Sequence, residues 1–178
     1  MTTEIKPKAK IFIVDDMPGP RDAARKTFEG LGCEVAETES AELAEEMLAS
    51  GLRPDCIILD LKLPGMSGGR FLDVIRRRWE PLAERVVLWS SNIQSEVTSY
   101  MKEAYKLNEL NQPTSAPTPA GMWKVGGENT STLGEMLVYI VGNLLTKHNV
   151  PISPQFAAKV QKAFQDLVSP FGIDDPHP

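Results

Sequence analysis

Three aspartates follow two short apolar segments of the sequence and could act together chemically. Asp15 and Asp16 come directly after Ile11-Phe12-Ile13-Val14, and Asp60 comes directly after Cys56-Ile57-Ile58-Leu59. Each segment has the length of a buried strand. The carboxyl ends of parallel strands meet at one edge of a sheet, where ligands bind in α/β proteins. We therefore expect the three carboxylates to converge on one mouth.

Three carboxylates at such a mouth cannot all stay ionised without a cation, because each raises the pKa of the others. A bound divalent metal is the simplest remedy. Ligands that offer only oxygen, with no His or Cys nearby, favour Mg²⁺, which leaves room for a phosphoryl oxygen. The residues thus predict a magnesium site, in which Mn²⁺ could substitute, and they make Asp60 a candidate phosphoryl acceptor.

Strands and helices alternate around these residues, which predicts a parallel sheet covered by helices on both faces. Two helices have apolar residues at helical spacing: Ala23, Ala24, Thr27, Phe28 and Leu31 in the first, and Leu43, Met47 and Leu48 in the second. The expected helices are 21–30, 41–49, a third from Gly68 to near Trp79 and Pro81, 93–105 and 130–146, and Ser40 is the expected N-cap of the second. The further strands are expected at 34–36, 86–89 and 121–124.

The acidic residues and the segment after the third strand resemble the receiver domain of two-component response regulators. The resemblance covers roughly residues 9 to 147 and implies an α/β, flavodoxin-like (βα)5 doubly wound parallel sheet with strand order 2-1-3-4-5. This chain would add a C-terminal helix. The matching residues are Val14-Asp15-Asp16, Asp60-Leu61-Lys62-Leu63-Pro64-Gly65-Met66-Ser67-Gly68, Ser90 after the fourth strand and Lys124 after the fifth.

The resemblance also implies the metal ligands. Asp16, Asp60 and the backbone carbonyl of Lys62 would hold Mg²⁺, and Asp15 would act largely through a water on the metal. No other cofactor is expected.

The resemblance further implies a phosphoryl-transfer role without a separate enzyme activity. Asp60 would accept a phosphoryl group from a histidine kinase or a histidine phosphotransfer protein, and Lys124 would contact the phosphoryl oxygens. The Ser90 hydroxyl would turn toward the new phosphate and act as the switch. Such a protein signals through contacts with a downstream protein target, here through 93–124 and the C-terminal helix, and its own chemistry is limited to self-phosphorylation and autodephosphorylation.

Three positions depart from the family pattern. Two of them, Val125 and Gly121, together with the inserted loop and the extra helix, suggest an alternative function. Val125 stands where a proline is usual, Gly121 where an aromatic switch residue is common, and Ser91 where Ala or Gly is often found. The alternative is a phosphorylation-independent scaffold on a receiver fold. A third hypothesis, an Asp-nucleophile phosphohydrolase, fails because Lys62 occupies the second carboxylate position of its Asp-x-Asp pattern.

The chain divides into a receiver region, 9–148, between a flexible N-terminus, 1–8, and a C-terminal extension, 149–178. Within the receiver region, 106–120 carries three prolines and no periodicity, so it is expected to be an inserted loop, either a tolerated surface insertion or a partner-docking loop.

The extension contains an amphipathic helix that starts with Ser153 as N-cap and Pro154 at its first position. A short amphipathic helix is marginal alone in water, so its apolar face must bury against its own domain, a second subunit or a partner. A homodimer therefore remains open. The apolar face consists of Phe156, Val160, Phe164 and Leu167.

Composition limits the other function classes. The formal charge of −5 argues against general nucleic-acid binding, and the run Arg76–Arg78 is expected to be a solvated helix face. No apolar run has membrane-spanning length, which favours a cytoplasmic protein. Cys33 and Cys56 lack metal-ligand spacing and are expected to be small buried hydrophobes, while His148 and His177 are expected at the surface.

Overall fold

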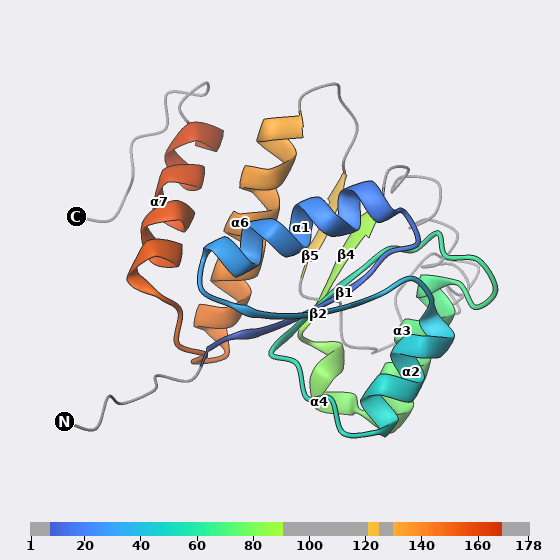
Figure 1. The fold of residues 1–178 in the computed structure, drawn as a ribbon. Helices are drawn as coiled ribbons and strands as arrows, with labels where there is room; N and C mark the ends of the chain where they lie inside the picture. Colours follow the sequence, from blue (N-terminus) through green and yellow to red (C-terminus); the bar gives the residue numbers. More distant parts are fainter. Residues whose placement is uncertain (1–7, 91–120, 125–129, 169–178) are drawn as a thin grey trace, which may run out of the picture.

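The computed structural model describes residues 8–90, 121–124 and 130–168. In this part of the chain one parallel sheet runs in the order β2-β1-β3-β4-β5 (Figure 1). The predicted flavodoxin-like order is confirmed. The strands are β1 (Lys10–Val14), β2 (Glu34–Thr38), β3 (Cys56–Leu59), β4 (Val86–Ser90) and β5 (Gly121–Lys124).

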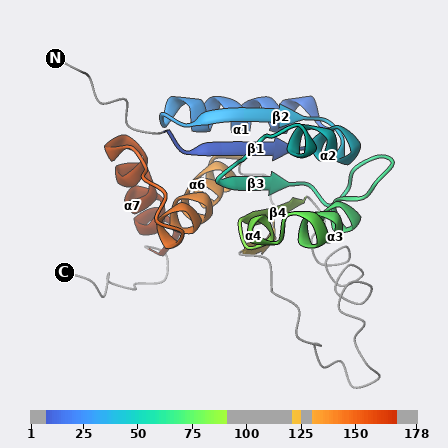
Figure 2. The ribbon, with the colours of Figure 1, turned by 90° about the horizontal axis from the view of Figure 1, so that it is seen from below.

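Helices cover both faces of this sheet. The helices α1 (Pro18–Gly30) and α6 (Thr130–Lys147) lie on one face, and α2 (Ala41–Ala49), α3 (Gly68–Arg78) and α4 (Glu80–Ala83) lie on the other (Figures 1 and 2). The predicted helix 93–105 and the predicted loop 106–120 lie outside the described residues.

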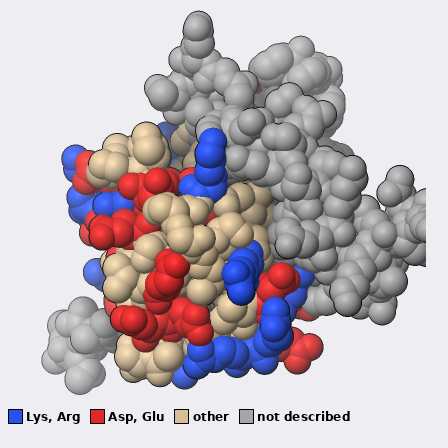
Figure 3. Space-filling model, turned by 90° about the vertical axis from the view of Figure 1, so that its right-hand side faces the viewer, with Lys and Arg blue, Asp and Glu red and all other residues tan. Residues whose placement is uncertain are grey.

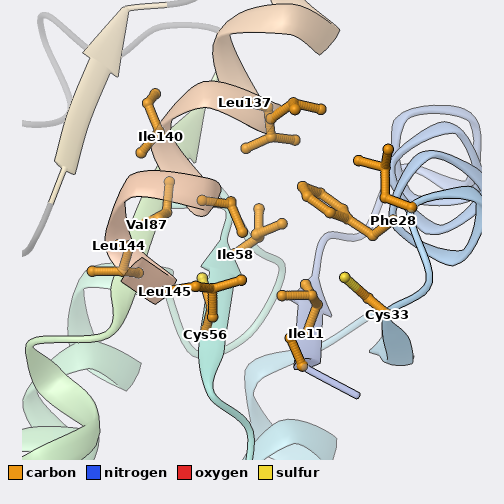
Figure 4. Packing of buried hydrophobic residues seen from close by; sticks show 14 of the residues in the cluster. Ile11, Phe28, Cys33, Cys56, Ile58, Val87, Leu137, Ile140, Leu144 and Leu145 are labelled. Atoms are coloured by element: carbon orange, nitrogen blue, oxygen red, sulfur yellow. The ribbon is translucent and has the colours of Figure 1, made fainter. Parts of the chain in front are cut away.

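The strands bury side chains on both faces, with a period of two residues. In β1, Phe12 and Val14 pack toward α2 and α3, whereas Ile11 and Ile13 pack toward α1 and α6. Figure 4 shows the second of these cores, in which side chains of the central strands meet those of α6 and Phe28 of α1. Each large apolar side chain that is fully buried contributes about 1.5–3 kcal/mol. The two cores therefore fix the positions of the strand ends.

The first helix begins earlier than the sequence predicts. It starts at Pro18 rather than Arg21. Proline is compatible with the first turn of a helix, where the backbone N–H has no intrahelical partner. The predicted apolar face is also too wide, because Ala23 and Thr27 are exposed while Phe28 is buried.

The helices on the opposite face also differ in detail from the prediction. In α2 the side chains that face the core are Ala41, Ala44 and Leu48, and Leu43 is 43% exposed. The helix α3 ends at Arg78 with Trp79 as its C-cap, close to the predicted end, and Pro81 lies in the first turn of the short helix α4, which was not predicted. Ser40 caps α2 as predicted, since its Oγ accepts a hydrogen bond from the Leu43 N–H at 3.2 Å.

The arginines at the end of α3 are only partly solvated. The Arg76 side chain is 14% exposed and lies 3.5 Å from Asp73, while Arg78 pairs with Glu45 of α2. The prediction of a fully solvated face is therefore wrong for Arg76. Arg77 is exposed, as expected.

The extra helix α7 (Pro154–Val168) packs on its own domain. Ser153 Oγ accepts from the Phe156 N–H at 3.0 Å, which confirms the predicted N-cap, and donates to the Leu31 carbonyl at 2.7 Å. Phe156 is buried against Phe28 of α1, edge to face, with ring centroids 5.9 Å apart. A Cβ at Gly142 of α6 would lie 2.2 Å from Val160 Cγ2, so glycine is needed there for α6 and α7 to approach. Of the three surfaces considered, the domain itself buries this helix.

The cysteines are buried and unpaired, as predicted. Burial raises the pKa of Cys33 to about 11 and raises that of Cys56 further, so both are neutral thiols at neutral pH. The surface prediction for His148 is wrong for one atom, because its Nε2 is buried and has no hydrogen-bond partner in the described part of the chain. His177 lies outside the described residues.

Among the described residues, no helix is both long enough and apolar enough to span a bilayer.

Candidate functional site

The three predicted acidic residues lie together at the edge of the sheet where the strands end. Oxygen atoms of Asp15, Asp16 and Asp60 all lie within 4.8 Å of one another. The register explains this, because Val14, the last residue of β1, is paired with Leu59, the last residue of β3. The parallel strands therefore deliver the carboxylates that follow them to one point.

Asp15 is the buried member of this cluster, with 8% of its surface exposed. Its N–H donates to the Thr38 carbonyl of β2 at 3.1 Å, and its Oδ1 accepts from the Met17 N–H at 2.8 Å. Burial raises the pKa of Asp15, and the neighbouring Asp16 charge adds to this, while the Met17 hydrogen bond and the Arg21 charge oppose it. A cation at the mouth would relieve this cost of burial and repulsion.

Arg21 supports Asp15 in a way that the sequence does not reveal. Its Nη1 donates to the Asp15 main-chain carbonyl at 2.5 Å, and its Nε lies 3.9 Å from the Glu37 carboxylate. The arginine therefore connects α1 and β2 to the backbone that presents the acidic pair.

Asp60 is fixed by its backbone and by the glycine that opens α3. Its N–H donates to the Val14 carbonyl at 2.9 Å, and its Oδ1 accepts from the Lys62 N–H at 3.0 Å. A Cβ at Gly68 would lie only 2.0 Å from the Asp60 carbonyl oxygen, so no larger residue fits there without movement of the loop. Gly68 in turn donates its N–H to the Leu61 carbonyl at 3.0 Å.

The other two predicted site residues lie at the same edge of the sheet. Ser90 and Lys124 are register partners at the ends of β4 and β5. Only the backbone of these two residues is described, so their roles toward a phosphoryl group stay predictions. Lys62 lies two residues after Asp60 and has an exposed side chain.

Both signs of charge occur on this face of the molecule. Figure 3 looks at it from the right-hand side of Figure 1, and red and blue side chains surround an uncharged area in its described part. The donor set of the mouth itself consists of carboxylate oxygens, which are hard ligands that fit Mg²⁺ and match neither zinc nor copper.

The comparisons with known proteins agree with this geometry. The model of the response regulator receiver domain matches residues 11–109, which is more than half of the chain. The chain belongs to the response regulator receiver domain family. It is therefore a receiver of two-component signalling, a family of signalling proteins whose members interact with histidine kinases or phosphotransfer proteins and generally bind Mg²⁺ at an acidic pocket.

Curated relatives match more than half of the chain. The nitrate/nitrite response regulator protein NarL of Escherichia coli K12 is 33% identical over 108 residues, 57% of this chain and 49% of NarL. Sporulation initiation phosphotransferase F of Bacillus subtilis is 28% identical over 106 residues, 58% of this chain and 82% of that protein. The chain thus spans about half the length of NarL, the first of these relatives.

Solved structures share the fold. A response regulator receiver domain protein from Clostridium thermocellum matches with a TM-score of 0.59 at 19% identity, over 80% of this chain and 98% of that one. The receiver domain of an HD domain-containing protein from Pseudomonas fluorescens Pf-5 gives a TM-score of 0.60 at 13% identity, over 82% and 100%. At these identities the likeness supports the fold alone.

The raised pKa of Asp15 leads to a prediction about the metal-free protein. The folded state holds the Asp15 proton more tightly than the unfolded state does, so this group lowers stability as the pH rises from near 4 through its folded pKa. We expect Asp15→Asn to raise the Tm of metal-free protein at pH 7 by about 2–4 °C, equivalent to about 1 kcal/mol. Thermal unfolding in a chelator at pH 4 and pH 7 checks this.

The matched control for this prediction is Asp166→Asn, which changes an exposed carboxylate on α7. The control is expected to show no such gain. A gain for Asp15→Asn that is as large at pH 4 as at pH 7 would contradict the explanation, because close to the ordinary Asp pKa of 3.8 only part of the cost of ionising the folded carboxyl has developed.

Proposed function

We propose that this chain is a phosphorylatable receiver in which Asp60 accepts a phosphoryl group from a histidine kinase or a histidine phosphotransfer protein. The observation that supports this most directly is the convergence of three carboxylates from the ends of β1 and β3 within 4.8 Å. Five hydrogen bonds, three at Asp15 and two at Asp60, and the close approach of Gly68 to the Asp60 carbonyl hold two of the three aspartates in place. Bringing three like charges together, one of them buried, costs free energy and has no structural benefit of its own.

The proposed chemistry is an in-line displacement at phosphorus. An Asp60 carboxylate oxygen forms the new P–O bond, the P–N bond of the phosphohistidine breaks, and the imidazole leaves with the electron pair. Asp15, Asp16, Asp60 and the Lys62 carbonyl would hold Mg²⁺. A bound Mg²⁺ would neutralise charge on the phosphoryl oxygens during transfer.

The ends of β4 and β5 would complete the site. Lys124 would pair with the phosphoryl oxygens, and Ser90 would donate a hydrogen bond to the phosphate once it has formed. A hydrogen bond to a charged group contributes about 1.5–3 kcal/mol, which would shift a conformational balance roughly ten- to a hundredfold.

The domain assignment belongs to the same proposal. The receiver would extend over 9–148, and the extension would contribute α7 as a cover for α1 and α6. The scaffold alternative is suggested by the insertion 106–120, the departures at Gly121 and Val125 and the extra helix. The phosphorylation test below separates it from the main proposal.

Incubating the purified chain with Mg²⁺ and acetyl phosphate, followed by intact-mass measurement, tests the function. We expect one phosphoryl adduct per chain that is labile to hydroxylamine and does not form in the presence of a chelator. A chain that gains no adduct, although it binds Mg²⁺ and is folded, would favour the phosphorylation-independent scaffold.

A further inference from the structure

One carboxylate of the neighbouring helix α2 binds the loop between Asp60 and α3. Glu42, in the first turn of α2, accepts a hydrogen bond on its Oε1 from the Met66 N–H at 2.7 Å. Twenty-four residues separate the two along the chain. The contact therefore joins the loop directly to a helix from a distant part of the sequence.

The loop is shaped to receive this carboxylate. Gly65 has a φ of +73°, a left-handed conformation that favours glycine. A Cβ at Gly65 would lie 2.5 Å from Glu42 Oε1, so the carboxylate fills the space above the glycine. Ser40 caps the helix that presents Glu42, and a carboxylate in a first turn is favoured by the helix dipole.

The other backbone hydrogen bonds described for this loop are local. Lys62 donates to Asp60, and Gly68 donates to Leu61, so both bonds stay within the segment itself. The side chains of Leu61, Leu63 and Met66 pack in the core under the loop. These buried side chains hold the loop against the core, and the Glu42 carboxylate holds its backbone through a hydrogen bond to a residue outside the loop.

A second contact joins the middle of α2 to the C-terminal end of α3. Arg78 of α3 pairs with Glu45 of α2, and its guanidinium lies 4.6 Å from the centre of the Trp79 ring. The helix α2 therefore contacts both the loop before α3 and the last residue of α3. A shift of α2 would be transmitted to the segment that follows Asp60.

We propose that Glu42 is a positioning residue for the Asp60 site. By fixing the Met66 amide it holds the loop that carries the Lys62 carbonyl, and so it sets the affinity of the mouth for a divalent cation. This inference rests on the proposed function. Groups that orient metal ligands typically change affinity 10- to 100-fold when removed, and we expect about 3- to 10-fold here because the contact is exposed to solvent.

The test compares Glu42→Ala, Glu42→Gln and the control Glu46→Ala, which removes an exposed carboxylate one turn along α2. Mg²⁺ is titrated into each metal-free protein by calorimetry, and amide hydrogen exchange is followed at Met66. Glu42→Ala should raise the Mg²⁺ Kd about 3- to 10-fold and speed exchange at Met66. Glu42→Gln keeps the oxygen acceptor and should stay near the wild type on both measurements, as should Glu46→Ala.

Different failures have different meanings. Wild-type protein that binds no Mg²⁺ would overturn the proposed function and this inference with it. Wild-type binding with an unchanged Kd in Glu42→Ala would overturn the inference alone. Equal weakening in Glu42→Ala and Glu42→Gln would also overturn it, because charge rather than the hydrogen bond would then be responsible.

A second variant covers the case in which Glu42→Ala does not fold. Gly65→Ala crowds the same carboxylate from the side of the loop and strains the left-handed backbone. It should weaken Mg²⁺ binding and speed Met66 exchange in the same way. Tight binding in a folded Gly65→Ala protein would contradict the role of this contact.

Discussion

Asp60→Asn is expected to abolish the phosphoryl adduct completely while the protein stays folded. A carboxylate oxygen can attack phosphorus, whereas the neutral amide oxygen of asparagine is a poor nucleophile and attracts a cation less strongly. The asparagine Oδ1 can still accept the hydrogen bond that Lys62 donates to Asp60. The variant therefore removes the chemistry but keeps the local backbone, and intact-mass measurement after incubation with acetyl phosphate and Mg²⁺ reads the result.

The matched control is Asp55→Asn, the same substitution at the residue directly before β3. Asp55 accepts the Lys10 N–H at 2.8 Å and lies 3.7 Å from Arg85, away from the edge where the acidic cluster lies. Asp55→Asn should form the adduct to the wild-type extent. An adduct of undiminished yield on Asp60→Asn would mean that another carboxylate accepts the phosphoryl group, and Asp15 or Asp16 would be the candidate.

The sheet follows from short-range rules that a sequence displays. Segments such as Ile11–Val14 and Cys56–Leu59 are apolar at every position, as in a parallel sheet covered on both faces. Because such strands are buried on both sides, their carboxyl ends are the natural position for polar residues. The convergence of the acidic residues was therefore predictable from their place after the strands.

Helix boundaries and helix faces were less predictable. Pro18 precedes the predicted helix 21–30 yet lies in the first turn of α1, because proline is compatible with a turn and with the first turn of a helix alike. Leu43 has the right spacing for the core of α2, yet it is exposed because the way the helix lies on the sheet sets the buried stripe. That orientation is a tertiary property.

The contacts that support the site were hidden for a different reason. Arg21 and Glu42 both bind main-chain groups, the Asp15 carbonyl and the Met66 amide. Every residue offers such groups, so no residue type at the receiving end marks the contact. Gly68 did carry a signal, but the reason for the glycine, the closeness of the Asp60 carbonyl, is visible only in the structure.

The contact between α7 and the domain leads to the second large prediction. Phe156→Ala should lower the free energy of unfolding by about 3–5 kcal/mol, the usual cost of removing a fully buried phenylalanine. The lost ring packs edge to face on Phe28, near the C-terminal end of α1. The acidic cluster lies near the other end of that helix, about 15 Å away at 1.5 Å per residue. Phosphorylation by acetyl phosphate should therefore survive below the melting temperature.

Urea unfolding followed by tryptophan fluorescence measures the stability, and Lys159→Ala supplies the control on the exposed side of α7. The control should stay within about 0.5 kcal/mol of the wild type. If Phe156→Ala is as stable as this control, α7 does not dock on α1 and α6 in solution. If instead the folded variant is no longer phosphorylated, α7 is coupled to the Asp60 site. At this distance, loss of the Phe156 contact would affect the carboxylates by shifting α1 or α6 as a whole.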